Sequence, residues 1–289
     1  MTPAFVVEII TPKKFVLNGL WFGPKKPKRV IIFVHGLTAS AFSMRHVVDA
    51  LTDSHTAVVT FNNRGFEQVS EVKRIVGRER KWVMAGAGHE KFTECADDIQ
   101  GAVNFVRKSG VKNIYLAGHS TGCQKAFYWA SKNKGNRGVK GIILFGPLSD
   151  YAVLTSQDEK GRLRKAIAHA KHLVRSGKPH KLMPEGSGLW FRCDAQRFLS
   201  LATPNSAEEI FPYAQPRREP RVVRKVYIPT LVLLAGAEEH GKESPKQLAS
   251  WFENNLQKGE VVIVPRVKHS FRGGEKRVSS AIGRWIKRP

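Results

Sequence analysis

The chain has 289 residues, enough for one large α/β domain with a substantial buried core. Hydrophobic residues make up 42% and charged residues 25%, a balance that argues against intrinsic disorder. The net charge of +24 is unusual, but the basic residues are spread along the chain. Without a basic arm or an aromatic-interleaved RNA-binding signature, we expect no dedicated nucleic-acid or membrane partner, only non-specific affinity for polyanions.

Targeting and metal-binding signals are also missing from the sequence. No stretch approaches the roughly 20 apolar residues of a membrane span, and the N-terminus lacks the pattern of a signal peptide. We therefore expect a cytoplasmic protein. Cys95, Cys123 and Cys193 lie far apart and fit neither a disulfide framework nor a zinc motif. We expect neither a cofactor nor a metal, and the oligomeric state stays open.

The first part of the chain predicts a hairpin followed by alternating strands and helices. Residues 6–10 and 15–20 form the hairpin, and residues 30–34 are apolar on both faces, as in a central parallel strand. A helix over 42–51 and a strand over 56–61 follow. His35-Gly36-Leu37 comes directly after a strand, at the sheet edge where α/β proteins bind their ligands.

The alternation continues after a long polar segment, residues 65–91, which contains extended pieces. Helical periodicity covers 91–109, and a strand ends at Ala117. The predicted elements that follow are a helix over 124–132 and a buried strand over 139–145. This pattern indicates an α/β fold with a mostly parallel central sheet flanked by helices.

The pattern breaks between residues 151 and 225, where no buried strand appears and proline is frequent. We interpret 151–225 as an inserted cap, or lid, and residues 1–150 and 226–289 as the core. A basic helix over 160–175 is expected within the cap. The core then resumes with elements listed in chain order: a strand over 229–235, a helix over 244–256, a strand over 260–264 and a helix over 276–287.

Gly118-His119-Ser120-Thr121-Gly122 lies between a predicted strand and a predicted helix. In that context Gly-x-Ser-x-Gly is typical of a nucleophile elbow, a sharp turn that presents its serine above the sheet edge. The small residues are needed because neighbouring backbone passes close by. We predict Ser120 as a nucleophile.

Two further polar groups follow core strands, in the order acid and then histidine. Glu238 and Glu239 come after one strand, and His269 after the last. A histidine activates a serine by taking its proton, and a carboxylate orients the imidazole. The amides of Thr121 and Leu37 are the candidate oxyanion donors. His269 is preferred as the base by its position, while His35 and His119 are read as structural and His240 as solvent-facing.

With these motifs the chain resembles the α/β-hydrolase superfamily, as an esterase-like serine hydrolase with a cap insertion. The resemblance covers about residues 27–150 and 226–289 and includes the His-Gly loop, the elbow and the C-terminal histidine. It implies an α/β-hydrolase fold and a catalytic triad. The usual acid is aspartate, so the resemblance leaves Glu238, Glu239 and, from a position used by some relatives, Asp150 as alternatives, with Glu238 preferred.

These residues predict a carboxylesterase that works through a Ser-His-Glu triad and an acyl-enzyme, with a small-molecule ester as substrate. Thioesterase, lactonase or C–C hydrolase chemistry would use the same triad. A non-catalytic basic binding protein on the same fold is the alternative from another class.

Overall fold

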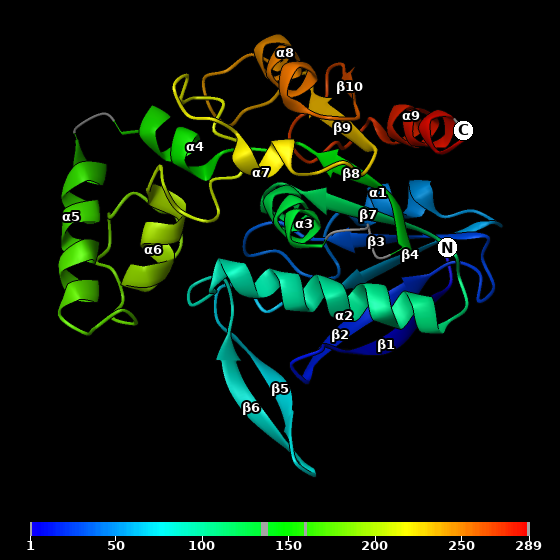
Figure 1. Ribbon diagram of the computed structural model, residues 1–289, viewed down its shortest axis with the longest axis horizontal. Coiled ribbons are helices and arrows are strands. Elements are labelled where there is room, and N and C mark those ends of the chain that lie inside the picture. Colours follow the sequence, from blue (N-terminus) through cyan, green and yellow to red (C-terminus); the bar gives the residue numbers. More distant parts are fainter. Residues whose placement is uncertain (1, 134–137, 159–160, 288–289) are drawn as a thin grey trace.

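The computed structural model describes residues 2–133, 138–158 and 161–287, which build one ten-stranded sheet (Figure 1). The strands are β1 (Ala4–Ile10), β2 (Phe15–Phe22), β3 (Arg29–Val34), β4 (Thr56–Phe61), β5 (Ser70–Val76), β6 (Glu79–Ala85), β7 (Asn113–His119), β8 (Val139–Phe145), β9 (Thr230–Ala235) and β10 (Gly259–Val264). Their order is β10-β9-β8-β7-β3-β4-β2-β5-β6, with β1 paired to β2.

The six strands from β10 to β4 in this order are all parallel, and the remaining pairs are antiparallel. Parallel strands place their carboxyl ends at one edge of a sheet. The loops after β3, β7, β8, β9 and β10 therefore meet at that edge. The predicted α/β-hydrolase fold, a mostly parallel sheet flanked by helices, is confirmed.

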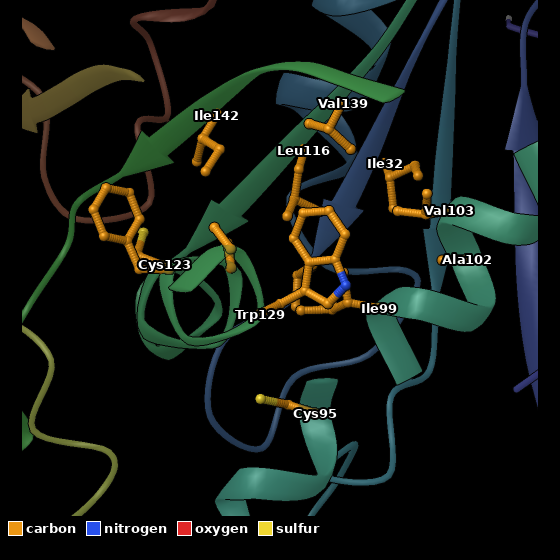
Figure 2. Close-up of a cluster of buried hydrophobic side chains, with 14 of the residues drawn as sticks. Ile32, Cys95, Ile99, Ala102, Val103, Leu116, Cys123, Trp129, Val139 and Ile142 are labelled. Carbon is orange, nitrogen blue, oxygen red and sulfur yellow. The ribbon is translucent and has the colours of Figure 1, made fainter. Parts of the chain in front are cut away.

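Helices cover both faces of the sheet. They are α1 (Arg45–Leu51), α2 (Cys95–Lys108), preceded by the 3-10 turn η1 (Phe92–Glu94), α3 (Thr121–Lys132), α8 (Pro245–Asn255) and α9 (Glu275–Ile286). Alternate residues of β3 divide between two cores: Ile32 packs with α2, α3 and α8, while Phe33 packs with α1 and α9. Figure 2 shows the first core, where Ile32 and Leu116 lie near Ile99 and Trp129.

The segment between β8 and β9 carries α4 (Asp150–Ser156), α5 (Arg162–Arg175), α6 (Ala195–Ala202) and α7 (Arg221–Arg224). Helices α4, α5 and α6 lie to one side of the sheet, on the left in Figure 1. They have a third apolar cluster of their own, against which Leu37 of the loop after β3 packs. This segment therefore contacts the carboxyl edge of the sheet.

Several elements differ from the sequence-based expectations. The helix expected from residue 42 begins at Arg45, because Met44 in a left-handed conformation (φ 58°) precedes it. Helices α4, α6 and α7 were not predicted at all. The extended pieces within 65–91 form the β5–β6 hairpin, which projects at the bottom of Figure 1. Within the described residues, no helix combines the length and apolar character needed to cross a bilayer.

Candidate active site

Ser120 lies between β7 and α3 with φ 54° and ψ −126°, a conformation rare for a residue with a side chain. Its amide donates a hydrogen bond to the carbonyl of Phe145 at 3.0 Å. The turn is tight enough to require glycine on both sides. A Cβ on Gly118 would lie 2.3 Å from the carbonyl oxygen of Gly122, and one on Gly122 would lie 2.3 Å from that of Val34. The fold therefore has the predicted elbow.

Glu238 and His269 form a buried side-chain pair at the carboxyl edge of the sheet. Glu238 follows β9 and His269 follows β10, and Glu238 Oε2 lies 2.9 Å from His269 Nδ1. The other carboxylate oxygen accepts hydrogen bonds from the amides of Glu239 and His240, each at 3.1 Å. The loop backbone thus fixes the carboxylate that orients the imidazole.

Glu239 contacts the same histidine through its main chain. Its Oε2 accepts a hydrogen bond from the His269 amide at 2.9 Å. The sequence alone left the two glutamates as alternatives, and the structure gives them different contacts. Glu238 binds the imidazole, whereas Glu239 holds the backbone that carries it.

The imidazole of His269 lies beside the elbow. A Cβ on Gly146 would be 2.9 Å from His269 Nδ1, and Gly146 directly follows Phe145, whose carbonyl accepts the Ser120 amide hydrogen bond. His269 Nε2 is buried and has no hydrogen-bond partner in the described part of the chain, so its bond to Ser120 Oγ is not formed here. Catalytic hydrogen bonds are often long before substrate binds.

Three further histidines surround His269. His119 Nε2 lies 3.0 Å from the His269 carbonyl oxygen, and His46 Nε2 lies 2.8 Å from that of Ser270. Burial, together with the neighbouring His269, lowers the pKa of His119 to about 3, so His119 is neutral at working pH and its Nε2–H donates. The ring of His240 packs edge-on at 4.9 Å from that of His269. His240 is therefore half-buried against the site rather than solvent-facing.

The two predicted oxyanion donors are both available. The amides of Thr121, at the first position of α3, and Leu37 have no acceptor among the described residues. A Cβ on Gly36, next to Leu37, would lie 3.0 Å from the Ser120 Cβ, so the loop after β3 approaches the elbow closely. His35 is buried, and burial, reinforced by the charge of Lys125, lowers its pKa to about 3. It shapes the loop as a neutral residue.

Asp150, the third candidate acid, has different surroundings. It is the first residue of α4 and accepts a hydrogen bond from Gln124 Nε2 at 2.7 Å, with no His269 contact in the described residues. Burial, together with the nearby Glu208 carboxylate, raises its pKa to about 8. A carboxyl group that is protonated near neutral pH cannot orient an imidazole as an anion does.

A buried ion cluster lies behind the elbow and joins the core to α6. Glu90 Oε1 is 2.5 Å from Lys125 Nζ on α3, and its Oε2 is 3.1 Å from Arg197 Nη2 on α6. Arg197 also forms an ion pair with Glu208. Lys125 and Arg197 have fully buried side chains. No periodic pattern in the sequence indicates this cluster, because a buried lysine and a surface lysine look the same in the chain.

The three cysteines are buried free thiols.

One set of side chains, His89, His180 and Asp194, has the composition of a metal site, although no resident metal was expected from the sequence. It shares no residue with the Ser120 site.

The sheet order, the elbow and the loops that follow the strands define an α/β-hydrolase fold. Three solved structures share it at 15–17% identity, which establishes the fold alone. The siderophore hydrolase EstB from Aspergillus fumigatus matches at 15% identity with a TM-score of 0.73, over 99% of this chain and 97% of that chain. Est1E from Butyrivibrio proteoclasticus with bound ferulic acid matches at 17% identity with a TM-score of 0.65, over 97% of this chain and 98% of that chain. The Pyrococcus furiosus esterase Pf2001 matches at 16% identity with a TM-score of 0.60, over 99% of this chain and 92% of that chain.

A family assignment comes from the sequence itself. The family described as "Protein of unknown function (DUF1749)" matches residues 79–282. The match covers well over half of the chain, which therefore belongs to this family. No curated protein matches the sequence.

Proposed function

We propose that the protein is a serine hydrolase acting on carboxylic esters, with Ser120, His269 and Glu238 as its catalytic triad. One observation carries the proposal: Glu238 Oε2 lies 2.9 Å from His269 Nδ1, while the buried Nε2 of the same ring has no hydrogen-bond partner among the described residues. This arrangement leaves Nε2 as the atom that takes a proton from Ser120. The esterases among the structural neighbours support the same chemistry.

In the proposed reaction Ser120 Oγ attacks the ester carbonyl while His269 Nε2 takes its proton. Glu238 holds the imidazole in the tautomer with hydrogen on Nδ1 and stabilises the imidazolium. The amides of Leu37 and Thr121 donate to the oxyanion of the tetrahedral intermediate. His269 returns the proton to the leaving alcohol, and a water molecule then hydrolyses the acyl-enzyme by the same steps.

Residues 151–225 act as a cap in this proposal. Leu37, a proposed oxyanion residue, packs on the apolar cluster to which Leu154 and Leu163 belong. These two leucines also line a cavity of about 280 Å³ between α4, α5 and the loop around Leu189. The cavity lining also includes Gln157, Asp158 and Arg162, so the packing of Leu37 is the contact that links the cap to the oxyanion loop.

Labelling with a fluorophosphonate probe tests the proposal directly. The wild-type protein is expected to react at Ser120 and to hydrolyse p-nitrophenyl esters, while Ser120→Ala does neither. A series of acyl-chain lengths then measures what the cap admits. Equal labelling of wild type and Ser120→Ala would refute the proposal, and turnover of thioesters or lactones in preference to esters would redirect it.

A further inference from the structure

Three potential metal ligands converge where the loop after β6 meets the segment before α6. Asp194 Oδ2 lies 3.1 Å from His89 Nδ1 and 2.8 Å from His180 Nδ1. The backbone links the same two segments, because the Asp194 amide donates to the Gly88 carbonyl at 2.8 Å. His89 lies 105 positions from Asp194 in the sequence and His180 lies 14 positions from it. None of the three belongs to the proposed triad.

The charge of Asp194 needs a partner. Its side chain is fully buried, and its Oδ1 caps α6 by accepting the Arg197 amide at 2.8 Å. Within residues 2–133, 138–158 and 161–287, no lysine or arginine forms an ion pair with it, and its side-chain partners are the two imidazoles. A buried carboxylate is costly unless a cation or hydrogen-bond donors compensate it.

The donor set and its spacing fit a divalent transition metal. Two imidazole nitrogens and one carboxylate oxygen are ligands of Zn²⁺, with a water molecule in the fourth position. The three atoms lie within 4.8 Å of one another. An ion about 2.0–2.2 Å from each would separate tetrahedral ligands by roughly 3.3–3.5 Å. The two distances to Asp194 Oδ2, 3.1 and 2.8 Å, are close to this spacing. His180, with 73% of its side chain exposed, has the freedom to make the remaining adjustment.

We propose that His89, His180 and Asp194 bind a divalent transition-metal ion that links the core to the cap. The two imidazoles and one carboxylate favour Zn²⁺ as this ion. Bound there, the ion neutralises Asp194 and replaces the two hydrogen bonds with metal bonds. It fixes His89 directly beside Glu90, whose carboxylate pairs with Lys125 and Arg197. The exposed side of His180 gives the ion an entry path.

The full-length protein, stripped with a chelator and dialysed, is titrated with ZnCl₂ by calorimetry, and CoCl₂ provides an absorption spectrum of the coordination. We expect one Zn²⁺ per chain, tetrahedral Co²⁺ bands, and a rise of about 5 °C in Tm at saturating metal that a chelator reverses.

His180→Ala is the main variant, since an exposed side chain can be removed without loss of folding, and it is expected to weaken Zn²⁺ binding at least 100-fold. His89→Ala provides a second test. His169→Ala, which removes another exposed histidine on α5, is the matched control and retains wild-type binding. Absence of stoichiometric binding by the wild type, or binding by His180→Ala equal to that by His169→Ala, would overturn the proposal.

Discussion

At the scale of single residues, Glu238 and Glu239 hold one histidine in two ways. Glu238→Gln replaces the carboxylate at Nδ1 by an amide and favours the wrong tautomer, so we expect kcat to fall about 10³–10⁴-fold with little change in KM. Glu239→Gln keeps an oxygen that accepts the His269 amide hydrogen bond, and a loss of about 10-fold or less is expected. Kinetics on p-nitrophenyl butyrate measure both. A larger loss from Glu239→Gln would assign the acid role to that residue instead.

His119 offers a second test at this scale, as a positioning residue. His119→Leu leaves the buried His269 carbonyl without its donor, a cost of about 1–3 kcal/mol. Carried in full by the transition state, this cost lowers kcat roughly 5- to 150-fold. His119→Gln places an amide N–H near the former Nε2 position and is expected to recover most of that loss at unchanged KM. The two variants are compared by kcat and by Ser120 labelling rate. Equal values of kcat for His119→Leu and His119→Gln would show that the hydrogen bond to the His269 carbonyl does not position the histidine.

At the scale of elements, the ion cluster joins α3 to α6 through Glu90. Glu90→Gln leaves the buried charges of Lys125 and Arg197 with less compensation, and a destabilisation of about 3–5 kcal/mol is expected. The matched control is Glu8→Gln, because Glu8 forms an exposed ion pair with Arg80 and its loss costs about 0–1 kcal/mol. Urea unfolding measures both free energies. Similar losses of unfolding free energy in Glu90→Gln and Glu8→Gln would mean that burial does not strengthen the ion pairs of the cluster.

The core elements could be predicted from the sequence because each has a local signal. The strand that ends at the elbow and α2 follow from apolar periodicity, and α8 begins with a capping box of Ser244 and Gln247, a local pattern that marks a helix start. The elements in 151–225 had weaker signals. Helix α7 is only four residues long, and α6 depends on the N-cap Asp194 and on Arg197, a buried charge that periodicity counts as a surface residue.

The residues of the candidate site also differ in how far the sequence predicts them. Ser120, His269 and the glutamate pair follow from their positions after strands, because parallel strands bring those loops to one edge. Which glutamate contacts the imidazole depends on the conformation of a loop, and no sequence spacing determines that. His46 lacked any signal, since its contact with the Ser270 carbonyl joins residues 224 positions apart.

At the scale of the whole molecule, the buried acids make stability depend on pH. The pKa of Asp150 is about 8 in the folded protein, whereas an unfolded aspartate titrates near 3.8. The folded state therefore keeps a proton that the unfolded state loses, so Asp150 by itself contributes a loss of stability as pH rises from about 4 to about 8. Glu209, whose pKa burial raises to about 7, contributes in the same direction.

Asp150→Asn removes the titration and keeps an acceptor for Gln124. We expect the stability of the variant relative to wild type to increase between pH 5 and pH 8.5, by at least about 1 kcal/mol. Thermal unfolding at the two pH values measures the difference. A relative stability that is the same at both values would show that Asp150 is ionised in the folded protein.

The backbone of Ser120 also has a consequence for the choice of an inactive variant. Its φ of 54° with ψ of −126° costs about 1–3 kcal/mol in a residue with a Cβ, and glycine adopts it freely. Ser120→Ala and Ser120→Gly both lack the proposed nucleophile, but only the alanine variant keeps this strain. We expect Ser120→Gly to unfold at higher urea, by about 1 kcal/mol after the entropy of glycine is deducted. The difference between the two variants thus measures the conformational energy stored in the turn that presents the Ser120 hydroxyl, with no substrate present.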